Sequence, residues 1–179
     1  MILNKKCTRI LKLQGRQMDI SAKKPIIIGS DHAAYQLKEK ISIFIGSLGI
    51  DIKDAGTFSE SSVNYVDYAK KVAGAVSRSE FSRGILLCGT GLGMSIAANR
   101  FPNVRATLCS DILSARMSRQ HNDSNILVLG GRLIGDLLAF ELVKTWIDTP
   151  FEGGRHLNRI ESIETIIQSQ ELGFEHKQH

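Results

Sequence analysis

The sequence of 179 residues is poor in the features of secreted, membrane-spanning and metal-binding proteins. It has only three cysteines, Cys7, Cys88 and Cys109, with no CxxC spacing. This argues against a disulfide framework or a structural zinc site and indicates a reducing, cytoplasmic compartment. No apolar run reaches the roughly 18 residues that span a bilayer, so we expect no membrane association. With 42% hydrophobic residues and three prolines, the chain can bury one core but is too short for two ordinary domains.

An excess of one charge is also missing from most of the chain, although the net charge is +5. Residues 1–17 carry five basic and no acidic side chains, and the remaining 18 basic residues match the 18 acidic ones. A nucleic-acid-binding face is therefore not indicated. We interpret residues 1–23 as a flexible basic extension, 24–172 as one domain and 173–179 as a polar tail. A weakly amphipathic segment or an artefact of start-codon choice are alternatives for the extension, whereas charges interrupt it too often for a secretory signal.

Short apolar runs alternate with helix-forming segments along the rest of the chain. This alternation predicts an α/β fold, in which a five-stranded parallel sheet lies between two layers of helices. The result would be a single-domain, three-layer α/β/α Rossmann-like fold with an extra C-terminal helix. The predicted strands lie near 25–29, 50–53, 84–88, 104–110 and 125–130. The predicted helices cover 35–48, 65–78, 94–98, 111–118, 136–147 and a last segment ending near 170.

The most specific stretch is 84–100, where an apolar run ends in Cys88 and alternating glycines before a helix begins. Gly89, Gly91 and Gly93 let the backbone bend sharply, so that its N–H groups can converge on an anion at the positive end of the helix. A thiolate would be stabilised there and could act as a base or a nucleophile. The alternative is a buried cysteine at a strand end, followed by glycines that only make the turn.

Several other glycine-rich motifs are excluded by spacing. A dinucleotide fingerprint needs a third glycine where this chain has Met94 or Ile96. A Walker loop needs a lysine that is missing, and a cysteine phosphatase needs an arginine at the position of Met94. A non-catalytic nucleotide-binding module remains an alternative, because Asp111 follows Gly91 by 20 residues and could contact a ribose.

Other candidate residues also follow predicted strands or helices. Asp31 and His32 follow the first strand, where ligands bind in open α/β sheets, although Asp31 could only cap a helix and His32 could only be on the surface. Tyr65 could wall a sugar or simply pack against the core. His121 ends a predicted helix and could serve only as a partner of the helix dipole.

Two arginines near the C-terminus are spaced to act together. Arg155 and Arg159 are four residues apart, so on a helix they share a face and could bind one phosphate. The alternative is a solvated basic turn in which Glu152 and Glu161 pair with these arginines.

Taken together, these motifs resemble the type B ribose-5-phosphate isomerases, a family that includes galactose-6-phosphate isomerase subunits. The resemblance covers about residues 24–170. It is carried by Gly-Ser-Asp-His at 29–32, Asp-Ala-Gly-Thr at 54–57, Asn-Tyr at 64–65, the whole stretch 84–99, Ser-Arg-Gln-His-Asn at 118–122 and Glu-Gly-Gly-Arg-His-Leu-Asn-Arg at 152–159.

The resemblance implies an isomerase of ribose 5-phosphate and ribulose 5-phosphate that acts through an enediolate, without cofactor or metal. Cys88 would remove the carbon-bound proton, His121 would help to open the sugar ring, and Asp31 would assist near the ring oxygen. Thr90 would lie beside the reacting oxygens. The implied substrate-binding residues are Asp31, His32, Tyr65, Gly89, Thr90, Gly91, Leu92, Gly93, Asn122, Arg132, Arg155 and Arg159.

Within that list, the backbone of 89–93 would hold the enediolate charge. His32, Arg132, Arg155 and Arg159 would bind phosphate, while Tyr65 and Asn122 would line the sugar. The resemblance also implies a homodimer whose sites are shared between chains, with pairing of dimers into tetramers as a further alternative. A six-carbon substrate such as galactose 6-phosphate or allose 6-phosphate is the alternative to the pentose.

Overall fold

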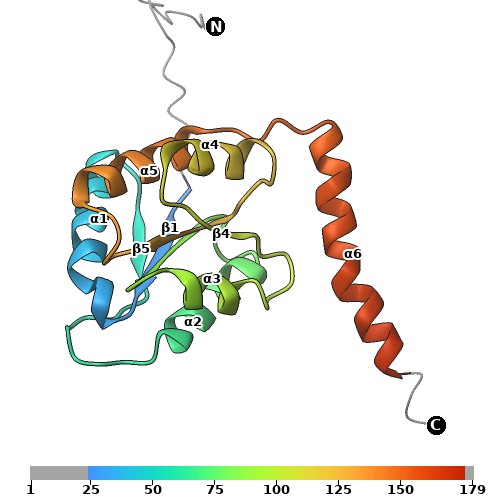
Figure 1. The fold of residues 1–179 in the computed structure, drawn as a ribbon, viewed down its shortest axis with the longest axis horizontal. Coiled ribbons are helices and arrows are strands. Elements are labelled where there is room, and N and C mark those ends of the chain that lie inside the picture. The colour runs from blue at the N-terminus through green and yellow to red at the C-terminus, as the bar shows by residue number, and fades with distance from the viewer. Residues whose placement is uncertain (1–23, 176–179) are drawn as a thin grey trace, which may run out of the picture.

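The computed structural model describes residues 24–175 (Figure 1). The predictions for residues 1–23, including Cys7, lie outside the described residues, as does the end of the predicted polar tail.

The centre of the fold is the predicted five-stranded, all-parallel sheet. Its strands are β1 (Ile26–Ser30), β2 (Ile52–Asp54), β3 (Gly84–Cys88), β4 (Ala106–Leu108) and β5 (Ile126–Gly130). They are arranged in the order β2-β1-β3-β5-β4. The α/β prediction is confirmed, although β4 is shorter than its apolar run because it is an edge strand with one neighbour.

Helices cover both faces of the sheet because its central strands are apolar on both sides. Along β1, Ile26 and Ile28 belong to one buried cluster, whereas Ile27 belongs to the other. The first cluster includes side chains of α1 (Tyr35–Ser47), α4 (Ile112–Gln120) and α5 (Asp136–Asp148). The second includes side chains of α2 (Tyr65–Ser77) and α3 (Leu92–Ala98). These are the three predicted layers.

The connections leave neighbouring strands on opposite faces of the sheet. After β1 the chain enters a short 3-10 helix, η1 (His32–Ala34), and then α1 on the first face. After β3, which pairs with β1, the chain enters α3 on the second face. In open parallel sheets such a divergence creates a crevice at the carboxyl ends of the two strands.

The last helix, α6 (Arg155–Glu175), extends beyond the layered body (Figure 1). It ends five residues beyond the predicted end near 170. Ile160 is its buried anchor, and Glu164 forms an ion pair of 2.9 Å with Arg105. Leu157, Ile163 and Ile166 are 45%, 47% and 55% exposed. Among residues 24–175, no helix combines the length and apolar character needed to cross a bilayer.

Candidate active site

The predicted glycine turn is present at the carboxyl end of β3. The N–H of Gly91 donates a hydrogen bond to Cys88 Sγ at 3.1 Å. Gly91 has a φ of +79°, and a Cβ there would lie 2.4 Å from Leu108 Cδ1. Only glycine fits this position, which places a backbone amide directly against the sulfur.

The sulfur of Cys88 is buried. The side chain is only 5% exposed and belongs to the buried cluster that includes Met94 and Val128. The reason is strand geometry, since Cys88 is the last residue of β3 and its side chain points to the face that α3 covers. The thiol therefore forms the floor of the site.

A second turn is tied to the first by backbone hydrogen bonds. The N–H of Gly131 donates to the carbonyl of Cys88 at 2.8 Å, and the N–H of Arg132 donates to the carbonyl of Gly89 at 3.0 Å. These bonds place Arg132 alongside the glycine turn, where a Cβ on Gly89 would lie 3.5 Å from Arg132 Cδ.

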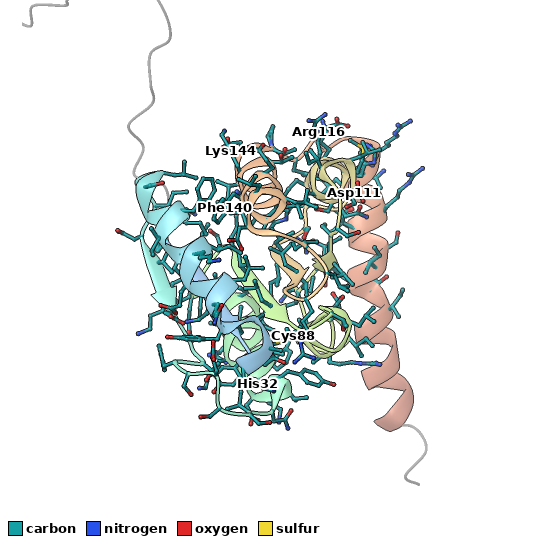
Figure 2. The ribbon with its side chains drawn as sticks, turned by 60° about the vertical axis from the view of Figure 1, so that its left-hand side comes forward. His32, Cys88, Asp111, Arg116, Phe140 and Lys144 are labelled. Carbon is teal, nitrogen blue, oxygen red and sulfur yellow. The ribbon has the colours of Figure 1, made fainter. Side chains whose placement is uncertain are left out.

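Asp31 and His32 follow β1 at the same end of the sheet, where the N–H of Asp31 donates to the carbonyl of Leu87 at 3.1 Å. Figure 2 labels His32 and Cys88 in this part of the molecule. Asp31 is 7% exposed and caps η1 by accepting the N–H of Ala33 at 3.0 Å. His32 Nδ1 accepts the N–H of Val63 at 3.2 Å, so its proton resides on Nε2. That tautomer leaves a donor for a ligand. His32 and Arg132 line one cavity of about 400 Å³.

Tyr65 and Thr90 complete this group. Asn64 caps α2 by accepting the N–H of Val66 at 3.0 Å, which starts the helix at Tyr65. The ring of Tyr65 lies over Gly93, where a Cβ would come within 2.6 Å of it. Thr90 is exposed, and its Oγ1 accepts the N–H of Leu92 at 3.4 Å. Tyr65 is 38% exposed, so it both packs on the turn and borders solvent.

The other predicted site residues gather around His121, which ends α4. Its ring stacks on His156, with centroids 4.2 Å apart and planes inclined by 5°. Glu152 Oε2 lies 3.9 Å from His121 Nε2 and 3.7 Å from His156 Nε2. Burial, His121 and Arg155 lower the pKa of His156 in that order, which favours its neutral form.

Arg155 and Arg159 lie on exposed turns of α6 with the predicted four-residue spacing. The Nε of Arg155 lies 3.5 Å from His156 Nε2. Glu152 was considered as a partner of these arginines, but the structure places it against the two histidines instead.

The two groups lie at opposite ends of the strands, with the Cys88 group at the carboxyl ends and the His121 group at the amino ends. The carbonyl of Asn122, the residue after His121, accepts from Arg105 Nε at 3.1 Å, and Arg105 directly precedes β4. The Cys88 turn instead lies beside Gly131, just after β5 ends. The four steps of about 3.3 Å along a five-residue strand place its two ends on the order of 13 Å apart. A single chain therefore does not bring His121 and Cys88 together.

One set of three possible metal ligands occurs among the described residues, namely His121, Glu152 and His156, whose ligand atoms lie within 4.8 Å of one another. Two histidines and a glutamate can hold zinc. Here, however, the imidazole rings are stacked in nearly parallel planes, so their nitrogen lone pairs do not converge on one ion. The three residues in this arrangement form a polar cluster.

Asp111, the residue considered for a nucleotide ribose, has a structural role. Its carboxylate caps α4 by accepting the N–H of Ser114 at 2.8 Å, and this hydrogen bond lowers its pKa. The nucleotide-binding alternative thereby loses its acidic residue.

His156 is the residue that the sequence analysis missed. It was noted only as part of the motif at 152–159, yet it supports the ring of His121. The signal in the sequence was its place within the motif at 152–159, next to Arg155.

Comparisons with a family model and with known proteins point to the same family of sugar-phosphate isomerases. The sequence model of a family described as Ribose/Galactose Isomerase matches residues 26–163. Ribose-5-phosphate isomerase B of Escherichia coli strain K12 is 46% identical over 145 residues, which are 81% of this chain and 97% of that protein.

Two solved structures of ribose-5-phosphate isomerase B are similar throughout the described domain. The protein from Clostridium thermocellum is 49% identical with a TM-score of 0.80, covering 82% of this chain and 99% of that one. The protein from Thermotoga maritima is 56% identical with a TM-score of 0.77, covering 79% and 98%.

Proposed function

The chain belongs to the ribose/galactose isomerase family, and from this premise we propose that it interconverts D-ribose 5-phosphate and D-ribulose 5-phosphate. The observation that carries the proposal is the hydrogen bond from the Gly91 N–H to Cys88 Sγ. A backbone amide directed at sulfur stabilises a thiolate, and the reaction needs a base at that place.

In the proposed mechanism, the Cys88 thiolate removes the proton from C2 of the open-chain aldose. The electron pair of that bond moves into an enediolate, whose negative charge is held by backbone amides of 89–93 and the hydroxyl of Thr90. The thiol then returns the proton to C1, which restores the thiolate, while the hydroxyl proton on O2 passes to O1, so that the carbonyl forms at C2 and the ketose results. No external oxidant or reductant is required, because the carbonyl only moves between neighbouring carbons.

Substrate binding is assigned to the side chains around the same turn. The Nε2–H of His32 and the guanidinium of Arg132, which share a cavity, would donate to the sugar phosphate. Asp31 would accept a sugar hydroxyl and Tyr65 would border the ring.

We further propose that the active enzyme is a homodimer in which a second copy supplies His121, Asn122, Arg155 and Arg159. The separation of the two groups across the sheet supports this, because ring opening and proton transfer act on neighbouring atoms of one sugar. The exposed apolar residues of α6 support it as well, because such side chains are commonly covered by a partner. A tetramer of two such dimers is the larger alternative, which light scattering would distinguish.

The proposed catalytic domain is 24–172, with residues 1–23 dispensable for catalysis and 173–179 as a tail that overlaps the last turn of α6. A cytoplasmic location is supported by two free cysteines, Cys88 and Cys109.

The deciding experiment compares Cys88→Ala with Cys109→Ala in an isomerisation assay that contains a metal chelator. Burial raises the pKa of the Cys109 thiol, which favours its protonated form. Cys109 is therefore the matched control, because replacing it removes a thiol that is not the proposed base. We expect Cys88→Ala to lower kcat by about 100-fold or more while substrate still binds, and Cys109→Ala to stay near wild type. Near-normal turnover by Cys88→Ala would refute the cysteine base.

The second candidate substrate is a hexose 6-phosphate, since the matched family description names galactose as well as ribose. Side-by-side values of kcat/KM for ribose 5-phosphate, galactose 6-phosphate and allose 6-phosphate would distinguish them. A preference for either hexose would replace the pentose assignment while keeping the same chemistry.

A further inference from the structure

A second polar cavity, of about 510 Å³, lies at the amino ends of the strands. It is far from the Cys88 turn, which lies at the carboxyl ends of the strands. Residues that enter each strand contribute to it, and they are Ile26, Ile50, Arg83, Arg105 and Asn125. None of the residues assigned to the substrate lines this cavity.

The lining carries an excess of positive charge. As far as the described residues extend, it includes four cationic side chains, Lys24, Arg83, Arg105 and Arg119, and two acidic ones, Asp123 and Asp148. Both acids are already paired. Asp123 binds Arg105 and Arg119 at 3.1 and 2.7 Å, and Asp148 binds Lys144 at 2.6 Å.

Arg119 is the central residue of this cavity. It is only 6% exposed, and its terminal nitrogen donates to Asp123 Oδ1 at 2.7 Å and to the carbonyl of Ser124 at 2.6 Å. Its Nε is buried and has no hydrogen-bond partner within the described part of the chain. A buried, charged donor without an acceptor is costly, so the Arg119 guanidinium keeps unmet hydrogen-bonding capacity beside the cavity that it lines.

Arg83 lies close to Arg119 and is also short of negative charge. One of its terminal nitrogens donates to the carbonyl of Ile147 at 2.7 Å, which uses one of its five N–H groups. Burial and repulsion by Arg119 lower the pKa of Arg83 to about 10. Both guanidinium groups lie near the ring of Trp146, with Cζ 5.3 and 5.8 Å from its centroid.

We propose that this cavity binds a small phosphorylated metabolite, with its phosphate dianion held between Arg83 and Arg119. The dianion matches the excess of two positive charges and relieves the repulsion between the guanidinium groups, which also fit phosphate geometry. The volume is in the usual range for small-molecule sites and exceeds what phosphate alone requires. This second site does not depend on the isomerase activity.

The fluorescence of a tryptophan in the chain can report anion binding at this site. Trp146 is the only tryptophan, is fully buried and has both guanidinium groups near its ring, so an anion that binds them should change its fluorescence. We would titrate the full chain with inorganic phosphate and with glycerol 3-phosphate, using chloride to keep the ionic strength constant. A saturable change in emission is expected for both, and tighter binding of glycerol 3-phosphate would identify a metabolite site rather than a site for free phosphate.

Four variants test the assignment. Arg83→Gln should weaken the fluorescence-detected affinity at least tenfold, and Arg83→Lys should retain part of it, because the charge is kept. Lys24→Gln, at the exposed rim, provides a second test without disturbing the core, and we expect severalfold weaker binding. Arg159→Ala, which alters only the proposed substrate-phosphate contact, should leave the titration unchanged.

The proposal is overturned if wild type gives no saturable change beyond that of chloride, or if Arg83→Gln and Lys24→Gln both bind like wild type. It is also overturned if Arg159→Ala abolishes the signal, because the anion would then be at the substrate site. Far-ultraviolet circular dichroism identifies any variant that does not fold, in which case Lys24→Gln decides.

Discussion

Gly91 shows how one residue shapes the turn at which catalysis is proposed. Its positive φ turns its N–H toward Cys88, and its missing side chain leaves room for Leu108 and for the backbone of Leu129. Both properties are needed together, because a residue that could adopt the angle would still collide with β5.

Replacing Gly91 with alanine tests this requirement. A left-handed backbone angle costs alanine about 1–2 kcal/mol, and the clash adds a similar amount, so the free energy of unfolding should fall by roughly 2–4 kcal/mol. Turnover should fall with it, because the amide would leave the sulfur. Urea denaturation and the isomerase assay measure both effects.

Gly46→Ala is the matched control, because Gly46 lies in α1 and a Cβ added there would have nothing within 4 Å. Alanine should raise the free energy of unfolding there by about 0.5–1 kcal/mol. Equal effects at the two glycines would contradict the role of Gly91.

At the scale of elements, the junction of α4 and α6 depends on a histidine pair. The ring of His156 in the first turn of α6 packs on His121, the residue that caps the end of α4, with Glu152 beside both. The two rings stack best when they do not carry like charges. Protonation of His156 should therefore weaken the attachment of α6.

The sign of this pH effect follows from the lowered pKa of His156. Between the ordinary value of 6.5 and the lower folded value, the unfolded chain holds a proton on His156 that the folded chain does not. Acid therefore favours unfolding in this range, and Tm should fall as the pH is lowered from about 7.5 to about 5.5. Calorimetry of His156→Gln should show a shallower decrease, whereas an unchanged pH dependence would exclude His156 as its source.

At the scale of the whole molecule, the sheet separates the two groups of residues that the proposed reaction would combine. Cys88 and His32 lie at the carboxyl ends of the strands, while His121 lies at their amino ends, beside the start of α6. Under the proposed function, each complete site includes the base of one copy and the ring-opening histidine of another.

Subunit complementation tests this arrangement. Cys88→Ala and His121→Ala should each be inactive, but an equimolar mixture that has been allowed to exchange subunits should recover about a quarter of wild-type activity. Half of the dimers would be mixed, and each would contain one intact site. No recovery, with exchange demonstrated by mass spectrometry, would place both residues in the same chain's site.

The sequence was sufficient to predict the strands, the layers and the glycine turn. Apolar runs of strand length bounded by glycine lead to β1, β3 and β5 because burial on both faces leaves few alternatives. It was also sufficient for the spacing of Arg155 and Arg159 on one helical face. The depth of Cys88 and the pairing of Glu152 with histidines could not be predicted, because each depends on which distant segment packs beside it.

The order of residues alone determined which chemical groups are available and where each strand delivers them. Local rules suffice for that, since a strand end, a helix cap and a four-residue spacing involve only near neighbours along the chain. The tertiary structure alone decided that His121 packs on His156 and that Arg83 and Arg119 meet near Trp146. The physical reason is that each contact joins segments far apart in the sequence, and no local pattern specifies which distant segments pack together.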